Sequence, residues 1–305
     1  GPARPPDVQR GDMPVPDEEL GRKLIDFTEL EPVTPPLGLN ARLRPYQQTG
    51  LDWLQFLHET GLGGVLADDM GLGKTLQTLA SIQVEQAAGR LKEPALIVCP
   101  TSVIQNWKSE AEKFTPALRV LTLHGPRRKP LFEQAGHADL VITSYPLLSR
   151  DIEHHKANLY SQIFFDEAQN LKNHQTSVAK AARKLSANNR FALTGTPMEN
   201  HLGELWALFD LVLPGYLGSH DEFRQQFRKP IEEQGDIEQQ ALLSRRIKPF
   251  LLRRTKEQVT PELPEKTEII KRVELNRSQR DLYETVRATM DKRIRELMAE
   301  KGAAR

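Results

Sequence analysis

The chain has 305 residues, enough for one large domain or two ordinary ones and for a sizeable buried core. Its hydrophobic share of 38% and charged share of 27% are typical of a soluble globular protein, and its apolar runs fall far short of the roughly 20 residues that a membrane span needs. The single cysteine, Cys99, leaves no disulfide partner and no thiolate zinc cluster, and it is compatible with a reducing intracellular compartment.

The formal net charge is only +1, but the charges are unevenly placed along the chain. Residues 241–305 hold 17 Lys and Arg against 10 Asp and Glu, which leaves 25 against 31 in the rest of the chain. The densest basic block, without an acid inside it, consists of Arg245, Arg246, Lys248, Arg253, Arg254 and Lys256. Such an asymmetry favours an anionic polymer as partner, although a solvated charged face has the same composition.

Residues 1–38 contain many prolines and little hydrophobic periodicity, so we predict a linker with a short helix near residues 17–27. The opening Gly-Pro without Met is typical of a remnant of tag removal. Residues 43–57, LRPYQQTGLDWLQFL, predict an amphipathic helix in which Leu51, Trp53 and Leu54 point inward. Gln47 in this helix is a candidate adenine reader, because an amide both donates to and accepts from a base edge.

Residues 63–79, GGVLADDMGLGKTLQTL, predict a short buried strand, a glycine loop and a helix. In such a phosphate-binding loop, glycines let the backbone curl around an anion and the helix N-terminus adds partial positive charge. Lys74 then contacts the β- and γ-phosphates, and Thr75 ligates Mg²⁺. The full pattern has glycine where Asp68 stands. The predicted nucleotide-binding residues are Gln47, Asp68, Asp69, Met70, Gly71, Leu72, Gly73, Lys74 and Thr75.

Further apolar runs predict strands at residues 95–99, 119–123, 139–143, 161–165 and 190–193. Helical patterns lie between several of them, including one with the apolar face Ile104, Trp107, Ala111 and Phe114. Strands that alternate with helices predict an α/β fold with a doubly wound parallel sheet. Ligands of such sheets bind at the carboxyl ends of the strands, where we expect the nucleotide site.

The apolar residues QIFF lead into Asp166 and Glu167, a second chemical element. Asp166 is placed to hold Mg²⁺, and Glu167 to activate the attacking water as a general base. Acidic pairs after strands are also common helix caps, so this interpretation depends on the glycine loop. Together the two elements predict Mg²⁺-dependent hydrolysis of a nucleoside triphosphate at its γ-phosphate.

Several hydroxyl-bearing turns follow the other predicted strands. The turn that contains Gly195 and Thr196 either senses the phosphate and relays its presence or is an ordinary turn. Contacts with nucleic-acid phosphates are possible for Thr101, Thr143, Ser144 and Tyr145, for which cap and turn roles are equally good alternatives. The histidines show no metal-ligand spacing and are interpreted as loop and surface residues.

ADDMGLGKT, CPTSVIQNW, VITSY, DEAQNLKN and ALTGTPMEN, in this order, resemble motifs I, Ia, Ib, II and III of the Swi/Snf-type ATPases of helicase superfamily two, and LRPYQ resembles their Q-motif. The similarity extends over about residues 39–283. Members have RecA-like lobes with the P-loop NTPase fold. They are ATP-driven double-stranded DNA translocases that remodel protein–DNA complexes, chromatin included, and generally do not separate the strands.

Carried over by motif, the resemblance implies ATP and Mg²⁺ as cofactors and double-stranded DNA as partner. It implies phosphate binding by Lys74, Mg²⁺ binding by Thr75 and Asp166, and a general base at Glu167. A coupling role is implied for Gln169, Gly195 and Thr196. The segments expected to face or support the DNA path contain Pro100, Thr101, Trp107, Thr143, Ser144 and Tyr145.

Two departures from the family pattern matter. Gln169 stands where many relatives have His, which puts the relay from the γ-phosphate to motif III in doubt and hints at a bacterial member. Family members also carry a second RecA-like lobe with arginine fingers, which we expect to be missing here, so the chain alone should turn over little ATP. We expect the first lobe at residues 39–215, and helical protrusion and last strands of that lobe at residues 216–305.

Asn276 and Gln279 predict a capping box at the start of a long charged helix. Its apolar stripe, expected to be exposed or to oligomerise, consists of Leu282, Val286, Met290, Ile294 and Leu297. Two other functions stay open: a catalytically inert module that binds nucleic acid or protein, and a strand-separating helicase. The expected location is intracellular, in the cytoplasm or nucleoid of a bacterium and otherwise in the nucleus.

Overall fold

The computed structural model describes residues 30–196, 201–263 and 276–302. The chain divides into two compact units between residues 263 and 264, and each is described by itself. The short helix predicted near residues 17–27 lies outside the described residues, as do the side chains of Ile294 and Leu297. None of the helices in the described part combines the length and the hydropathy that crossing a membrane requires.

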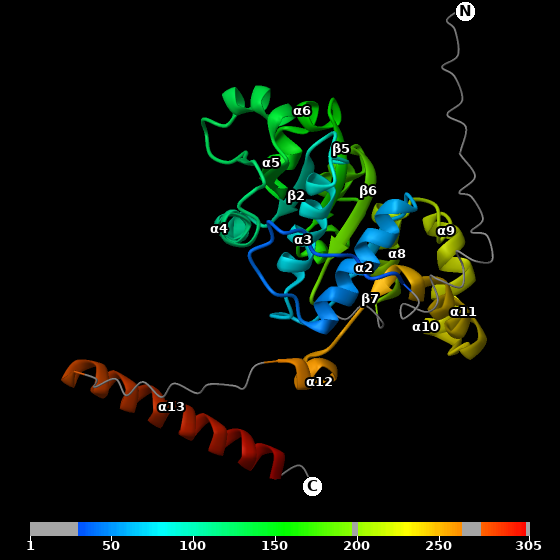
Figure 1. Ribbon diagram of the computed structural model, residues 1–305. Coiled ribbons are helices and arrows are strands. Elements are labelled where there is room, and N and C mark those ends of the chain that lie inside the picture. The colour runs from blue at the N-terminus through cyan, green and yellow to red at the C-terminus, as the bar shows by residue number, and fades with distance from the viewer. Residues whose placement is uncertain (1–29, 197–200, 264–275, 303–305) are drawn as a thin grey trace, which may run out of the picture. The chain divides into compact units, whose positions relative to one another are not determined.

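One parallel sheet of seven strands organises the first unit over its described residues (Figure 1). The strands are β1 (Gly64–Leu66), β2 (Ala95–Cys99), β3 (Val120–Thr122), β4 (Leu140–Ser144), β5 (Leu159–Phe165), β6 (Ser186–Leu193) and β7 (Leu251–Leu252). Their order across the sheet is β3-β4-β2-β5-β6-β1-β7. The doubly wound parallel sheet predicted from the alternation of strands and helices is therefore confirmed.

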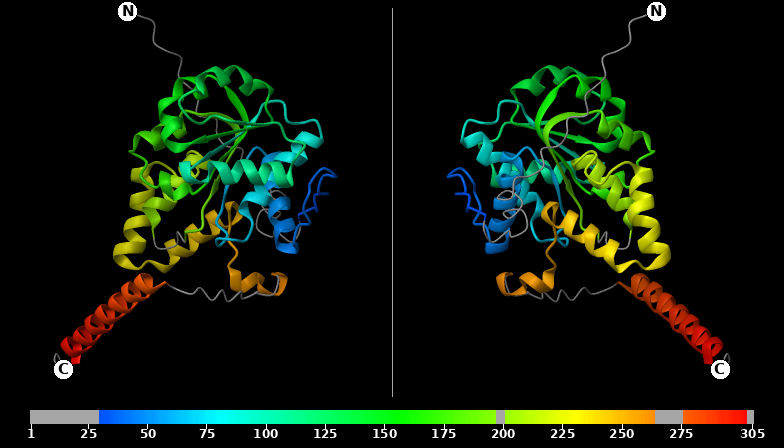
Figure 2. Two further views of the ribbon diagram at one scale, coloured as in Figure 1. Left: turned by 90° about the vertical axis from the view of Figure 1, so that its left-hand side faces the viewer. Right: turned by 90° about the vertical axis from the view of Figure 1, so that its right-hand side faces the viewer.

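Helices cover both faces of this sheet (Figure 2). The first layer contains α2 (Pro45–Glu59), α3 (Lys74–Ala87) and α4 (Ile104–Phe114), in which α3 contacts both α2 and α4. The other layer contains α5 (Tyr145–Arg150), α6 (Ile152–Lys156) and α7 (Ser177–Arg183), in which α5 contacts α6 and α7. The chain crosses the sheet in one direction from β1 through β2 to β3 and in the other direction from β3 through β4 and β5 to β6. Because the crossovers are right-handed, the helices of these two passes lie on opposite faces.

The apolar runs became strands because both faces of the central strands are covered by helices. Every residue of β2 and β4 is buried. On α2, Leu51, Trp53 and Leu54 have no exposed surface, as the amphipathic pattern predicted. The last strands of the lobe were expected within residues 216–305 without stated bounds, and the structure places one there, β7, whose two residues pair in parallel with Val65 and Leu66 of β1.

After β6 the chain forms a helical group beside β7 (Figure 1). Its helices are α8 (Leu202–Val212), α9 (His220–Phe223), α10 (Lys229–Gln234) and α11 (Ile237–Ile247). The short helix α12 (Lys256–Val259) follows β7, and Thr255 caps it by accepting from the backbone N–H of Gln258 over 3.3 Å. This group brings residues 251–262 back to the edge of the sheet next to β1.

The described part of the second unit is the helix α13 (Arg277–Gly302). Its predicted capping box is confirmed: the Asn276 N–H donates to Oε1 of Gln279 over 3.1 Å, and the Gln279 N–H donates to Oδ1 of Asn276 over 2.9 Å. Leu282, Val286 and Met290 are 67%, 54% and 59% exposed, so the described part of the apolar stripe is solvent-facing, as expected.

Candidate nucleotide site

The glycine loop joins β1 to α3 at the carboxyl edge of the sheet. Gly71 and Gly73 have φ values of 85° and 90°, a region that residues with a Cβ rarely adopt. A Cβ on Gly73 would also lie 2.5 Å from Nε2 of Gln47. Both glycines are therefore required by the backbone, and the strand–loop–helix order predicted from the sequence is confirmed.

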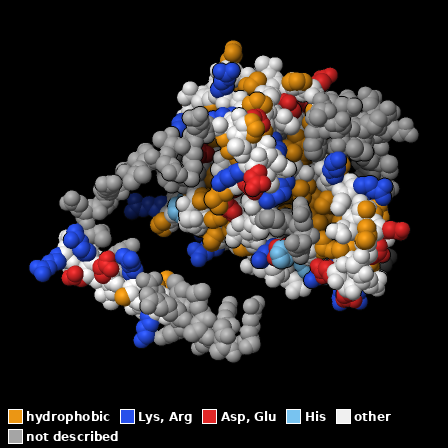
Figure 3. All heavy atoms as spheres, turned by 90° about the horizontal axis from the view of Figure 1, so that it is seen from below, with side chains coloured by type: hydrophobic (Ala, Val, Ile, Leu, Met, Phe, Trp, Pro, Cys, Tyr) orange, Lys and Arg blue, Asp and Glu red, His pale blue; other side chains and the backbone are white. Residues whose placement is uncertain are grey.

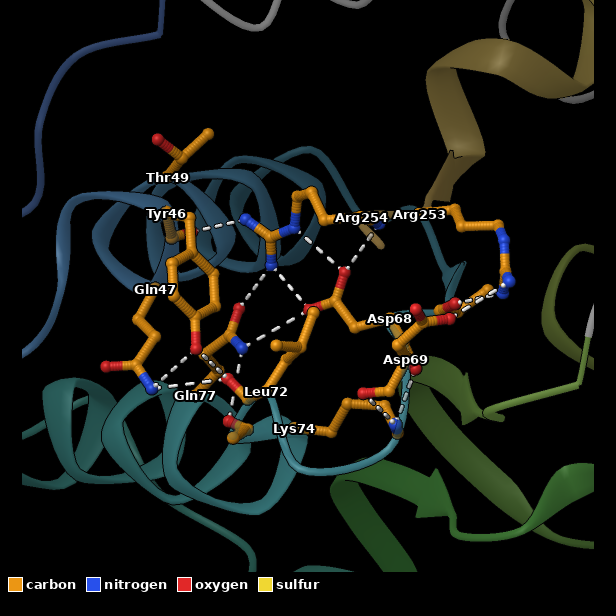
Figure 4. Close-up of polar contacts among 12 residues, drawn as sticks. Tyr46, Gln47, Thr49, Asp68, Asp69, Leu72, Lys74, Gln77, Arg253 and Arg254 are labelled. Atoms are coloured by element: carbon orange, nitrogen blue, oxygen red, sulfur yellow. Dashed lines mark hydrogen bonds and ion pairs between the residues drawn. The ribbon is translucent and has the colours of Figure 1, made fainter. Parts of the chain in front are cut away.

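Lys74 lies at the start of α3, and its Nζ donates to the backbone oxygens of Asp68 over 2.6 Å and Asp69 over 3.3 Å (Figure 4). Burial lowers the pKa of Lys74, while the nearby carboxylates, among them Glu167 and Asp166, act in the opposite direction. The ammonium is thus within electrostatic reach of the acidic pair at the end of β5. A lysine in this environment offers a phosphate oxygen a partly desolvated positive charge.

The turn that contains Gly195 follows β6, which stands between β5 and β1 in the sheet. This turn therefore lies between the acidic pair and the glycine loop. A Cβ on Gly195 would lie 3.8 Å from Nζ of Lys74 and 3.8 Å from the backbone nitrogen of Met70. The glycine loop, the acidic pair and the Gly195 turn therefore meet at one edge, as the parallel sheet requires.

Asp166 is held by three neighbours. Its Oδ2 accepts from Nε1 of Trp107 over 2.8 Å, its Oδ1 accepts from the backbone N–H of Glu167 over 2.9 Å, and its carbonyl accepts from the Tyr145 hydroxyl over 2.5 Å. Burial raises the pKa of Asp166, the charge of Glu167 adds to this, and the Trp107 hydrogen bond opposes it. Sequence reasoning assigned Trp107 to the DNA path and gave no signal of this contact.

Glu167 has φ of 46°, which makes it the only residue other than glycine with a positive φ in the described part of the chain. Its Oε2 accepts from Nε2 of Gln169 over 2.6 Å, and Oε1 of Gln169 accepts from the Thr194 hydroxyl over 3.0 Å. The Thr194 hydroxyl in turn accepts from the backbone N–H of Thr196 over 3.2 Å. Gln169 therefore makes a continuous bridge from the acidic pair to the Gly195 turn, although its coupling role stays a prediction.

Gln47 lies against the glycine loop and is 7% exposed. Its Nε2 donates to the Leu72 carbonyl over 3.2 Å, and its Oε1 accepts from the backbone N–H of Arg44 over 2.9 Å. The hydroxyl of Tyr46 donates to the same Leu72 carbonyl over 2.6 Å. The start of α2 is thus bound to the loop, which places the candidate adenine reader next to the candidate phosphate site.

The carboxylates of Asp68 and Asp69 form ion pairs with two arginines that follow β7 (Figure 4). Asp68 pairs with Arg254 over 2.6 Å, and Asp69 pairs with Arg253 over 3.1 Å. The arginines are separated from these acids by 186 and 184 residues, a distance at which sequence spacing says nothing about pairing. The only sequence signal is that two adjacent acids and two adjacent arginines each follow an apolar pair or run.

These ion pairs engage two members of the basic block that the sequence contains between residues 245 and 256. Arg253 and Arg254 are neutralised inside the lobe, whereas Arg245, Lys248 and Lys256 are exposed. On the face seen in Figure 3, Lys and Arg side chains lie in separate groups between acidic and hydrophobic ones. The basic surface available to an anionic partner is therefore smaller than the composition indicates.

Most of the predicted DNA-path side chains are buried. The Thr143 hydroxyl donates to the Leu123 carbonyl over 3.4 Å, and the Ser144 hydroxyl caps α5 by accepting from the Leu147 N–H over 3.4 Å. Buried side chains in the set are Trp107, Thr143, Ser144 and Tyr145, while Pro100 is half-buried and Thr101 is exposed. The segment after β2 can therefore contact a large ligand directly, whereas the buried side chains of the set lie inside the fold at the same edge of the sheet.

The interpretation of the histidines as loop and surface residues is wrong for His155. It lies in α6, has no exposed surface and has Nδ1 at 2.7 Å from the Tyr160 hydroxyl. Burial lowers its pKa to about 4. Metal-ligand spacing does not reveal a histidine on the inward side of a short helix.

A metal ion at this site would find few protein ligands. In the described ranges, no group of three or more His, Cys, Asp and Glu is arranged to hold a metal by itself. Mg²⁺ is commonly bound by one or two carboxylates together with water and substrate phosphates, a pattern that Asp166 and the half-buried Thr75 fit. The available groups therefore suit a metal that arrives with a phosphate ligand.

Comparison with known families gives a match over most of the chain. The family model described as SNF2-related domain matches residues 46–305. The solved Sulfolobus solfataricus SWI2/SNF2 ATPase core in complex with dsDNA has a TM-score of 0.72 and 41% identity, and the match covers 77% of this chain and 49% of that chain.

Two curated relatives illustrate the range of similar proteins. The chain is 47% identical over 278 residues to the putative ATP-dependent helicase/translocase YwqA of Bacillus subtilis, with 89% of this chain and 30% of that protein covered. It is 36% identical over 291 residues to the TATA-binding protein-associated factor MOT1 of Saccharomyces cerevisiae, with 88% and 16% covered. The chain thus spans less than a third of the length of either relative.

Proposed function

Because this chain belongs to the family of SNF2-related domains, we propose that it is the first ATP-binding lobe of a double-stranded DNA translocase that remodels protein–DNA complexes. The observation that carries the proposal is that Lys74, the Gly195 turn and the pair Asp166–Glu167 meet at one edge of the sheet. A triphosphate bound at this edge meets a cation from α3 on one side and a carboxylate pair from β5 on the other.

Each residue of this edge has a part in the proposed hydrolysis. Lys74 exchanges the carbonyls of Asp68 and Asp69 for phosphate oxygens, and backbone N–H groups of a glycine loop supply further donors to an anion. Glu167 accepts a proton from the attacking water. With their carboxylates held by arginines, Asp68 and Asp69 offer the nucleotide their backbone only.

Asp166 and Thr75 are the residues that would hold Mg²⁺. The ion supplies neutralisation of the charge that develops on the transferred phosphoryl group. Trp107 and the Glu167 N–H keep the carboxylate of Asp166 oriented, each through one of its oxygens. Gln47 remains the proposed adenine reader, and Gln169, Gly195 and Thr196 the proposed coupling elements.

Double-stranded DNA is the proposed partner, since one similar solved core is a complex with dsDNA. The exposed Thr101 follows β2 at the same edge as the nucleotide site, and the segment after β2 is the proposed contact. A DNA partner also places the protein inside the cell, in the cytoplasm or nucleoid of a bacterium or in the nucleus of a eukaryote.

We further propose that the 305-residue chain alone hydrolyses ATP slowly. The match to the solved ATPase core covers 49% of that chain, and the rest of such a core would have to supply any arginine finger. Loss of an arginine finger lowers phosphoryl-transfer rates by about 10³–10⁵. Turnover by this chain with duplex DNA at a rate typical of complete motors, and dependent on Lys74, would refute the slow-turnover proposal.

The experiment that tests the main proposal compares nucleotide binding and DNA-stimulated hydrolysis in the wild type and in Lys74→Ala. Lys74→Ala should abolish Mg²⁺·ATP binding by the chain and DNA-stimulated hydrolysis by the full-length protein. Lys92→Ala is the matched control, because Lys92 is exposed just before β2, at the opposite edge of the sheet. Equal ATP binding by the wild type and Lys74→Ala would contradict the proposal.

A further inference from the structure

We propose that Arg254 is a positioning residue that joins the adenine-reading segment to the phosphate loop, so that it makes the site selective for ATP over a bare triphosphate chain. The inference rests on the proposed function, in which Gln47 reads adenine and the glycine loop binds phosphates. It adds a residue that none of the nucleotide-binding motifs contains. Arg254 lies just after β7, whereas the segments it connects lie at the start of α2 and at the end of β1.

On the phosphate side, Arg254 grips Asp68 with three donors. Nε and the backbone N–H donate to Oδ1 over 2.8 and 3.0 Å, and Nη2 donates to Oδ2 over 2.6 Å. Asp68 has no exposed surface, and the Arg254 side chain is 11% exposed. The backbone oxygen of Asp68 accepts from Nζ of Lys74, so Arg254 binds the same residue as the lysine that is proposed to bind phosphate.

On the base side, the same guanidinium contacts α2. Nη1 donates to the Tyr46 carbonyl, and the guanidinium carbon lies 5.4 Å from the centre of the Tyr46 ring (Figure 4). Tyr46 precedes Gln47, and both side chains donate to the Leu72 carbonyl of the loop. One planar group therefore spans the adenine reader and the phosphate loop.

A third element is attached to the same group. Nη2 donates to Oε1 of Gln77 over 2.7 Å, and Nε2 of Gln77 donates to the Gly73 carbonyl over 3.1 Å. The fit is close, since a Cβ on Gly50 would lie 1.8 Å from Oε1 of Gln77 and 2.9 Å from Nη2 of Arg254. Glycine at position 50 lets α2 approach the guanidinium closely enough for the bond to Tyr46.

Arg253 provides the comparison, because its guanidinium bonds go to the phosphate loop. Nη1 donates to the Ala67 carbonyl over 2.8 Å, and Nη2 donates to Oδ1 of Asp69 over 3.1 Å. Both arginines thus bind the loop, and Arg254 binds α2 as well.

ATP occupies the adenine subsite and the phosphate subsite at a fixed separation, whereas tripolyphosphate needs the phosphate loop alone. Loss of the connection between α2 and the phosphate loop should therefore weaken the binding of ATP more than the binding of tripolyphosphate.

Arg254→Lys is the test variant. Lysine keeps a positive charge opposite Asp68, but its compact ammonium cannot reproduce the planar fork that reaches Asp68, Gln77 and Tyr46 together. Loss of the fork should weaken Mg²⁺·ATP about tenfold or more and Mg²⁺·tripolyphosphate by less than about threefold. Arg253→Lys should weaken both ligands by similar factors. Calorimetric or NMR titration measures the six affinities of the wild-type 305-residue chain and the two variants for these two ligands.

Two further variants keep the inference testable if Arg254→Lys does not fold. The double variant Asp68→Asn with Arg254→Gln replaces the buried charge pair by amides, and Gly50→Ala pushes first on Gln77 and then on the guanidinium with every charge in place. Both should show the same selective loss of ATP. An equal loss of ATP and tripolyphosphate in the variants that fold, as a general loosening of the lobe produces, would overturn the inference.

Failure of the proposed function has a different signature. If the wild type binds ATP no better than Lys74→Ala does, the nucleotide site itself is wrong and the inference falls with it. If the wild type binds ATP in a Lys74-dependent way and Arg254→Lys keeps the ATP-to-tripolyphosphate ratio, the positioning role alone is wrong.

Discussion

The indole Nε1 of Trp107 donates to Oδ2 of Asp166 over 2.8 Å, which connects the helix after β2 to the acidic pair after β5. Trp107 is 1% exposed, so the bond is shielded from water. It lowers the pKa of Asp166 against the raising effects of burial and of Glu167. The tryptophan thus favours the ionised carboxylate that Mg²⁺ binding requires.

Trp107→Phe should therefore move the acidic limb of the pH profile of Mg²⁺-dependent hydrolysis to higher pH. Without the indole donor the pKa of Asp166 rises further, and a larger share of the carboxyl is protonated at a given acidic pH. The loss of kcat/KM at neutral pH should be about tenfold or less, as for one hydrogen bond. Trp206→Phe removes a bond to the Gly218 carbonyl and is the matched control. Superimposable profiles for Trp107→Phe and the wild type would count against this role.

Glu167→Gly should stabilise the fold slightly or leave it unchanged while abolishing hydrolysis. A left-handed conformation costs a residue with a Cβ about 1–2 kcal/mol, which glycine avoids, and the extra freedom of glycine in the unfolded chain offsets about 0.5–1 kcal/mol. In contrast, Glu112→Gly, within the helix α4, should destabilise by up to about 1 kcal/mol. Urea unfolding measures both. Glu167→Ala loses the same bond to Gln169 but keeps a Cβ, so a Glu167→Gly variant no more stable than Glu167→Ala would show that the φ of residue 167 is not strained.

Gln169→Ala and Thr194→Val should each lower DNA-stimulated hydrolysis by the full-length protein without changing ATP affinity. Each variant breaks the bridge of 2.6 and 3.0 Å bonds between Glu167 and the Thr194 hydroxyl. Because the two residues belong to one chain of bonds, the double variant should lose little more than either single variant. Thr122→Val on β3 is the control, and fully additive effects of the two replacements would argue against a shared bridge.

The buried His155 predicts a defined loss of stability in mild acid. Its pKa is lowered to about 4 in the folded protein and is near 6.5 in the unfolded chain, so the unfolded state binds the proton first. The contribution of His155 to stability is complete above pH 6.5 and decreases as the pH falls toward 4, by up to about 3 kcal/mol. The facing groups are His154, which lowers this pKa further, and Asp151, which raises it.

His155→Gln should lose less stability than the wild type between pH 6.5 and 4.5, as measured by urea unfolding at each pH. Glu85, whose pKa is lowered to about 2, loses its contribution only below about pH 4.5 and does not obscure this window. His124→Gln, at an exposed position, should follow the wild type. Parallel curves for His155→Gln and the wild type would contradict the assignment.

A charge placed after β2 should weaken the proposed DNA contact. Thr101→Glu adds a carboxylate at an exposed position and should lower the affinity of the chain for duplex DNA. Log affinity of the wild type should also fall steeply with log salt if several phosphates are contacted. Thr176→Glu, at the exposed cap of α7, is the control. A flat salt response would point to a protein partner instead.

The sequence alone determined the parts of this protein that depend on neighbouring residues. Apolar runs predicted six of the strands, and GLGKT predicted the loop, because positive φ at Gly71 and Gly73 and the following helix are local properties. The placement of Asp166 and Glu167 also followed, since parallel strands bring their carboxyl ends to one edge. Motif order then indicated the family, which the match over residues 46–305 confirms.

Only the tertiary structure decided which distant side chains pair. The partners of Asp68 and Asp69 are Arg254 and Arg253, which arrive on a two-residue strand too short to produce a hydrophobic pattern. The bond from Trp107 to Asp166 joins the apolar face of α4 to the residue that follows β5. Such pairings depend on the order of the strands across the sheet, and local spacing and residue type do not determine that order.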